Sequence, residues 1–240
     1  MTEERLLALK ELESSLSHSF GDISRLDQAL VHRSYVNENP GFSSGDNERM
    51  EFLGDAVLEL CITDLLMKTF PDYTEGQLSK LRASVVNEQP LAELARELDV
   101  GRFLLLGKGE ESSGGRSKAS ILANTFEAII AAVYLDGGFD RAYEVVRRLF
   151  SSLIEEGSRN LTYRDYKTTL QELSQNRFRE IPRYSLIGEY GPDHDKIFES
   201  RLAIPGVLEA TGKGKSKKEA EQNAARSALD TLLQKPDEKG

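Results

Sequence analysis

The stretch from Asn47 to Leu66 constrains the fold more than any other, because its residues read as one helix with two chemically opposite faces. At about 100° per residue, one stripe of this helix is apolar and holds Met50, Leu53, Val57, Leu60 and Cys61. The opposite face gathers three carboxylates, those of Glu48, Glu51 and Asp55. For a helix considered alone, the ordinary interpretation of these carboxylates is a solvent-exposed acidic face.

A second stretch, Ile121 to Leu135, changes that interpretation. Its only charged residue is Glu127, and Asn124 lies one turn earlier on the same face. A helix this apolar should be buried, and an unpaired buried carboxylate costs several kcal/mol or takes up a proton. No lysine or arginine lies within the stretch, so the economical partner of Glu127 is a cation shared with the acidic face of the first helix.

The side chains that could hold this cation offer only oxygen atoms. They are Glu48, Glu51, Asp55, Asn124 and Glu127. Oxygen donors suit Mg²⁺ or Mn²⁺ and argue against zinc or copper. Gly54 stands beside Asp55 in mid-helix, where it costs about 1 kcal/mol relative to alanine. The missing side chain would let another helix or a substrate backbone come close.

Composition indicates a cytoplasmic protein without a membrane anchor. Of the 240 residues, 39% are hydrophobic and 30% are charged, which is typical of soluble globular chains. The longest apolar run, Ala128 to Leu135, is too short to span a bilayer, and the acidic N-terminus lacks the features of a signal peptide. The single cysteine, Cys61, lies on the apolar stripe and indicates a buried, reduced thiol.

The net charge of −9 argues against a nucleic-acid partner, but its distribution does not. Residues 1–161 carry 17 basic and 27 acidic side chains, whereas residues 162–234 carry 12 and 11. The chain therefore combines an acidic part, which we expect to bind metal, with a nearly neutral part that contains a local basic cluster.

The pattern of hydrophobic residues predicts two domains. No segment of residues 1–156 alternates like a strand, so this domain should be all-α, with the Asp-Gly-Gly of residues 136–138 ending one helix. Residues 157–162 form a polar linker, and residues 235–240 a tail. Residues 163–234 predict a small α+β domain with the order α-β-β-β-α, namely helix 165–175, strands 183–190, 196–204 and 207–214, and helix 216–233. We expect Ala220, Ala224, Ala228, Leu229 and Leu232 to form the buried stripe of the last helix.

Lysines at the start of the last helix indicate an anion site. Lys217 and Lys218 occupy its first turn, where a positive charge opposes the helix dipole, and Lys215 precedes them. Repeated phosphates would explain this arrangement, and an ordinary solvated basic run is the alternative. Ser216 and Glu219 form a capping box.

Two further features allow more than one interpretation. In the loop of residues 107–118, Arg116 and Lys118 either belong to a flexible connector or touch substrate phosphates. His32 has no second ligand at metal-binding spacing, which favours a structural hydrogen bond over a role as a ligand or base.

Four segments in this order, NERMEFLGD, ILANTFEA, GPDH and GKSKKEAEQNAA, resemble bacterial ribonuclease III, and the resemblance covers nearly the whole chain. It implies that Glu48, Asp55 and Glu127 are catalytic. It also implies metal ligation by a set of four residues: Glu51, Asp55, Asn124 and Glu127. Asn124 departs from the usual pattern, which has aspartate. Two Mg²⁺ ions, for which Mn²⁺ can substitute, would activate water and stabilise the leaving oxygen.

The second domain resembles a double-stranded RNA-binding domain. This resemblance implies minor-groove contacts by Thr168, Gln171 and His194, and phosphate contacts by Lys215, Lys217 and Lys218. Recognition would follow the A-form shape rather than the sequence.

By the same resemblance, the enzyme is a homodimer that cuts both strands of an RNA duplex, leaves 5′-phosphate and 3′-hydroxyl ends, and processes ribosomal and messenger RNA. Phe52 lies among the carboxylates, where a monomer would expose its ring. We therefore expect Phe52 to be buried in a pocket of the partner subunit.

Two alternatives remain from other functional classes. A regulator that binds double-stranded RNA without cleaving it has Asn124 as its only support. A di-iron carboxylate bundle requires Glu-x-x-His, and none of His18, His32 and His194 lies three residues after a glutamate.

Overall fold

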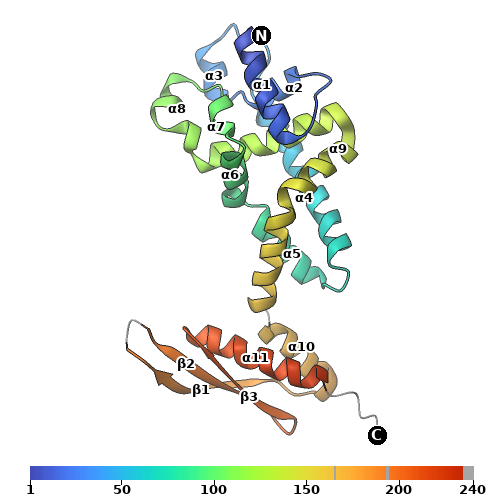
Figure 1. The fold of residues 1–240 in the computed structure, drawn as a ribbon, viewed down its shortest axis with the longest axis vertical. Coiled ribbons are helices and arrows are strands. Elements are labelled where there is room, and N and C mark those ends of the chain that lie inside the picture. The colour runs from blue at the N-terminus through green and yellow to red at the C-terminus, as the bar shows by residue number, and fades with distance from the viewer. Residues whose placement is uncertain (165, 193–194, 235–240) are drawn as a thin grey trace. The chain divides into compact units, whose positions relative to one another are not determined.

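The computed structural model describes residues 1–164, 166–192 and 195–234, and it divides the chain into two compact units (Figure 1). The first unit runs from Met1 to Gly157 and is helical, and the second begins at Ser158 and combines two helices with a sheet. The predicted fold class, an all-α domain followed by a small α+β domain, is confirmed.

The helices that begin in the first unit are α1 (Glu3–Leu16), α2 (Ser24–Ala29), α3 (Arg33–Glu38), α4 (Glu48–Thr69), α5 (Glu75–Val85), α6 (Glu88–Glu97), α7 (Val100–Phe103), α8 (Lys108–Ser112), the 3₁₀ helix η1 (Gly115–Ser117) and α9 (Ala119–Arg164). An isolated β-bridge between Val31 and Leu105 joins the segments that precede α3 and α8. Through this bridge, the His32 nitrogen donates to the Leu105 oxygen at 3.0 Å.

Helix α4 is the predicted two-faced helix, but its buried face is rotated from the predicted stripe. Met50, Val57 and Cys61 are buried as expected, whereas Leu53 is half-buried and Leu60 is 56% exposed. The buried face continues instead through Gly54 and on to Leu58, Ile62 and Leu66. The packing of Gly54 against α9 sets this rotation, because a helix can bury only the face that touches its neighbour.

The start of α4 is anchored by Asn47 rather than capped by it. The Asn47 side-chain nitrogen donates to the Ala29 oxygen at 3.0 Å, and its backbone N–H donates to the Val31 oxygen at 2.9 Å. These two bonds hold the first turn of α4, which carries Glu48 and Glu51, against the segment that follows α2.

Helix α9 runs through the core of the first unit. Every residue from Ala128 to Val133 is fully buried, and the rings of Phe126 and Phe150 pack edge to face with centroids 6.0 Å apart. The expected helix end at residues 136–138 is a kink, because Gly138 has a non-helical backbone with φ 75° and ψ −173°. The helix then continues to Arg164, so residues 157–162, predicted as a polar linker, are helical.

Within the described residues, one helix is long and apolar enough to cross a membrane by composition, the 41-residue segment Ala119–Arg159 of α9. Of its most apolar window, 61% is buried inside the protein. Such burial is the property of a helix at the centre of a folded domain.

The second unit contains α10 (Tyr166–Phe178), β1 (Arg183–Tyr190), β2 (Ile197–Ile204), β3 (Leu208–Gly214) and α11 (Lys217–Gln234). The three predicted strands are present and form an antiparallel sheet in the order β1-β2-β3. Helix α11 packs on β2 and β3 with the predicted stripe of Ala220, Ala224, Ala228, Leu229 and Leu232 buried. Gly212 lets β3 approach α11 closely, because an added Cβ would overlap the Ala224 nitrogen.

Candidate active site and nucleic-acid-binding residues

Gly54 brings the two acidic helices together. A Cβ added at Gly54 would overlap the carbonyl oxygen of Glu127 and lie 2.5 Å from its carbonyl carbon. Only glycine therefore allows α4 and α9 to pack at this distance. The approach places Glu51 and Asp55 on α4 opposite Asn124 and Glu127 on α9.

Both helices contribute to one electrostatic cluster. The Asn124 side chain is hydrogen-bonded to the Glu51 carboxylate, which ties α9 to α4. Asp55 and Glu51 each repel the charged form of Glu127, and Glu48 and Asp55 act in the same way on Glu51. The structure thus brings together the five side chains that the sequence analysis proposed from two distant stretches.

Glu127 is the most perturbed carboxyl group of this cluster. Burial, reinforced by the charges of Asp55 and Glu51, raises the pKa of Glu127 to about 7. Burial also raises the pKa of Glu51, and the hydrogen bond from Asn124 opposes this effect. No lysine or arginine in the described part of the chain forms an ion pair with Glu127. No cation in the described part of the chain therefore balances the charge of Glu127.

The donor set fits a hard divalent cation. Its atoms are carboxylate and amide oxygens, which Mg²⁺ and similar ions prefer. Within residues 1–164, 166–192 and 195–234, no three His, Cys, Asp or Glu side chains form a ready-made metal site by themselves. Because like charges repel, we expect these carboxylates to stay apart until a cation draws them together.

Glu48 lies at the rim of the cluster. Its carboxylate pairs with Arg33 at 2.8 Å, and both side chains are largely solvated. A cavity of about 230 Å³ lies beside it, and its walls include Glu51, Asn124 and Lys118. No sequence pattern indicates the ion pair between Arg33 and Glu48, because the two residues lie fifteen positions apart in unrelated local patterns.

His32 has the structural role that the sequence favoured. Its Nδ1 accepts a hydrogen bond from the Ser34 nitrogen at 3.2 Å and lies 2.8 Å from the Ser34 hydroxyl, so His32 caps the start of α3. Burial lowers the pKa of His32.

The two basic residues of the loop before α9 separate into different roles. Arg116 donates to the carbonyl oxygens of Gly101 and Leu104 at 2.9 and 3.0 Å and pairs with Glu111 at 2.6 Å. Its guanidinium therefore holds the loop, and the connector is ordered rather than flexible. Lys118 lines the cavity beside Glu48, with its Nζ 3.4 Å from Glu110.

In the second unit, the proposed RNA-binding residues lie on exposed surface. Thr168 and Gln171 are exposed and one turn apart on α10. The exposed lysines are Lys215, Lys217 and Lys218 at the start of α11. The Glu219 nitrogen donates to the Ser216 hydroxyl at 3.1 Å, and the Glu219 carboxylate accepts from the Lys215 nitrogen instead of the Ser216 nitrogen. His194 lies outside the described residues.

Phe52 is 83% exposed on α4, directly after Glu51. Leu60 and Met67 are also exposed, at 56% and 61%, and all three fall within one side of the helix at 100° per residue. Sequence reasoning identified Phe52 but placed Leu60 in the core. An apolar strip of this kind on a helix is a feature of contact surfaces.

Comparisons with known proteins agree with this geometry. Residues 22–153 match the protein family described as Ribonuclease-III-like, and residues 166–232 match the double-stranded RNA binding motif. Ribonuclease 3 of Syntrophobacter fumaroxidans is 50% identical over 228 residues, which cover 93% of this chain and 94% of that protein. Ribonuclease 3 of Streptomyces coelicolor is 52% identical over 228 residues, covering 95% and 81%.

A solved structure, the nuclease domain of ribonuclease III from Campylobacter jejuni, matches with a TM-score of 0.56 and 43% identity, over 60% of this chain and 96% of that one. The two curated relatives align with this chain over both of its units, and the solved nuclease domain matches over 60% of the chain. The chain therefore belongs to the ribonuclease III family, the endoribonucleases that cut double-stranded RNA.

Proposed function

We propose that this chain hydrolyses phosphodiester bonds of double-stranded RNA at the cluster between α4 and α9, with Mg²⁺ as its cofactor and Mn²⁺ able to substitute. The observation that carries the proposal is Glu127, a carboxyl group whose pKa is raised to about 7 between two further carboxylates. A structural role would favour a paired or neutral residue at this position, whereas a cation-binding role accounts for the unpaired charge.

The roles follow from position. Glu51, Asp55, Asn124 and Glu127 face one another across the Gly54 contact and would hold the cation. When bound, a divalent cation supplies an activated water and neutralises charge on the leaving oxygen, which gives 5′-phosphate and 3′-hydroxyl ends. Asp55, Glu127 and the rim residue Glu48 are the catalytic carboxylates, and Glu127 can hold or release a proton near neutral pH.

The second unit would supply binding. Thr168 and Gln171 project from one face of α10 and, with His194, would read the minor groove. Lys215, Lys217 and Lys218 would contact phosphates. The loop before α11 is well placed for this task, because Lys217 and Lys215 are paired only loosely, at 3.5 Å from Glu189 and 3.7 Å from Asp195.

Three wider assignments complete the proposal. The chain forms a homodimer through the exposed strip of Phe52, Leu60 and Met67, and the Campylobacter jejuni nuclease domain is described as having a region involved in dimer formation. Residues 1–156 form the catalytic domain and residues 163–234 the RNA-binding domain. The enzyme acts in the cytoplasm on ribosomal and messenger RNA precursors.

One cleavage experiment tests the chemistry. A long RNA duplex, end-labelled, is incubated with the wild-type chain and with Glu127→Gln, with and without Mg²⁺. We expect cleavage only by the wild type with Mg²⁺, and similar duplex binding by both proteins. Binding without cleavage by the wild type at every Mg²⁺ concentration would support the binding-only regulator instead.

A further inference from the structure

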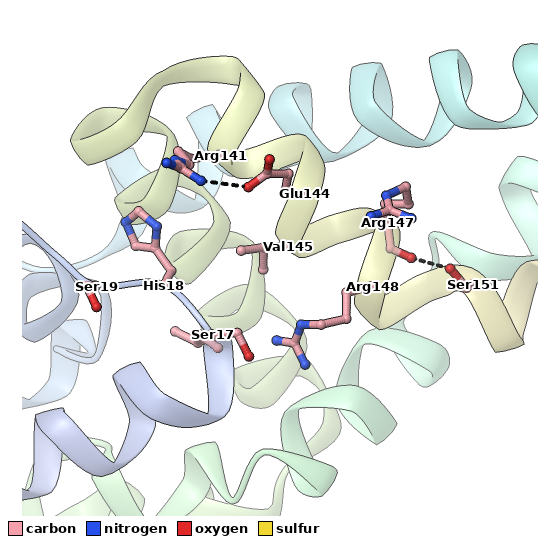
Figure 2. Close-up of a pocket in the computed structure, with 10 residues that line it drawn as sticks. Ser17, His18, Ser19, Arg141, Glu144, Val145, Arg147, Arg148 and Ser151 are labelled. Carbon is pink, nitrogen blue, oxygen red and sulfur yellow. Dashed lines mark hydrogen bonds and ion pairs between the residues drawn. The ribbon is translucent and has the colours of Figure 1, made fainter.

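A second cavity, of about 700 Å³, lies on the first unit and shares no residue with the acidic cluster (Figure 2). One wall is the turn that follows α1, with Ser17, His18 and Ser19. The other wall is the part of α9 beyond the Gly138 kink, with Arg141, Arg147 and Arg148. We call this cavity the arginine pocket. The chemistry proposed above uses none of these residues.

The lining of the arginine pocket is positively charged in a part of the chain that is otherwise acidic. Three guanidinium groups face a single carboxylate, Glu144, which pairs with Arg141 at 2.9 Å. His18 is bound to Asp136 at 3.2 Å and is buried. Because residues 1–161 carry 27 acidic and 17 basic side chains, this local excess of arginine runs against the composition around it.

Several hydrogen-bond donors of the pocket have no acceptor among the residues that the structure describes. The Arg147 guanidinium forms no hydrogen bond or ion pair with any residue that the structure describes. Arg148 donates once, to the Ser15 oxygen at 3.0 Å, and its side chain extends toward Ser17 (Figure 2). The hydroxyls of Ser17 and Ser19 and the backbone N–H of Ser19 likewise donate to no described residue. A concave surface with spare donors and almost no acceptors is built for an anion.

The volume of the pocket and its hydrogen-bond donors indicate which kind of anion would fit. Guanidinium groups bind phosphate in a bidentate manner and also stack on flat aromatic rings. The volume lies within the range of about 300 to 1,000 Å³ that is usual for small-ligand sites, far more than one phosphate needs. A nucleotide offers both a phosphate chain for the arginines and a ring to stack on a guanidinium plane. We propose that the arginine pocket binds a free nucleotide that carries a 5′-diphosphate or 5′-triphosphate.

The test is equilibrium dialysis of the full chain with labelled ADP and GDP. EDTA is present throughout, so that no metal can bridge phosphate to the acidic cluster. The double variant Arg147→Gln/Arg148→Gln should bind at least about tenfold more weakly, since each lost charge-assisted bond is a strong one. The matched control is Arg102→Gln, which removes an exposed arginine of the same unit that pairs with Glu11 at 3.0 Å. This control should bind like the wild type, and adenosine should not compete with ADP.

A second substitution should change ADP binding in the opposite direction. Glu144→Gln removes the only carboxylate of the lining and releases Arg141, so it should tighten ADP binding several-fold. Circular dichroism of each variant verifies folding. Arg147→Gln alone, which breaks no hydrogen bond or ion pair with a described residue, serves if the double variant unfolds.

Unchanged binding by the double variant would overturn the proposal, since the nucleotide would then be held elsewhere, for example at the lysines before α11. Weaker binding by Glu144→Gln, or no binding by the wild type at millimolar ADP, would overturn it as well.

Discussion

Replacing Gly54 by alanine at the contact between α4 and α9 should lower the stability of the protein modestly and its cleavage rate strongly. The added Cβ would overlap the Glu127 carbonyl oxygen and lie 2.5 Å from its carbonyl carbon, where nonbonded carbon atoms prefer about 3.5 to 4.0 Å. Both atoms of Glu127 belong to the backbone, so no side chain can rotate away. The two helices must therefore move apart by about 1 Å.

The energetic cost can be estimated from two opposing effects. Overpacking of a buried contact costs about 1 to 3 kcal/mol, and alanine recovers about 1 kcal/mol of helix propensity relative to glycine. The net loss of up to about 2 kcal/mol should lower the melting temperature by up to about 8 °C for a unit of this size. Catalysis should suffer more, because a displacement of about 1 Å between groups that share a cation can cost about 100-fold in rate.

Thermal melting by circular dichroism and cleavage of an RNA duplex at saturating Mg²⁺ would measure the two effects. The matched control is Gly76→Ala in α5, where an added Cβ meets nothing within 4 Å. This control should be stabilised by up to about 1 kcal/mol and remain fully active. If Gly54→Ala melted and cleaved like Gly76→Ala, the close contact would not define the site.

Asn124→Asp should lower the Mg²⁺ concentration for half-maximal cleavage several-fold, because it adds about 1 kcal/mol of attraction to the cation, and superimposable Mg²⁺ titrations would contradict this. Without divalent cations, the unfolding free energy of the wild type should fall as pH rises from about 4.5 towards 7, because the folded chain holds a proton on Glu127 that the unfolded chain releases earlier. Urea unfolding at several pH values should show a flatter profile for Glu127→Gln. Phe52→Ala should weaken the dimer in sedimentation, and an unchanged dimer would refute its place in the interface. Lys217→Gln and Lys218→Gln should each reduce the salt slope of duplex binding by about one, as measured by filter binding across salt concentrations.

The acidic site could be predicted because two of its residues do not suit the helices in which the sequence places them. Glu127 is the one charged residue in a stretch that must be buried, and Gly54 is a poor helix former at the centre of a helix. Each residue is unfavourable in its own helix, which indicates that a contact with another part of the fold requires it. In the structure one contact involves both residues, because Gly54 packs against the backbone of Glu127.

Other features depend on neighbours that the sequence does not reveal. Leu60 belongs to the apolar stripe by spacing, but α4 turns its Gly54 side toward α9 and leaves Leu60 exposed. The glycine at 138 has the backbone of a helix end, yet α9 resumes beyond it, so local conformation alone cannot distinguish a kink from a stop. Arg116 reads as a phosphate ligand only while its carbonyl and carboxylate partners, all from residues 101 to 111, are unknown.

The distribution of charge explains why the two units would interact with a polyanionic RNA in different ways. In the proposed function, the acidic first unit would repel RNA until cations bind at Glu51 and Glu127. The cations that supply the chemistry would then also remove a barrier to binding. Lysines in the first unit would weaken this dependence but would compete with the cations for the carboxylates. Under the proposed function, a separate unit supplies the affinity for phosphates, and its exposed Lys215, Lys217 and Lys218 would act without neutralising the carboxylates of the first unit.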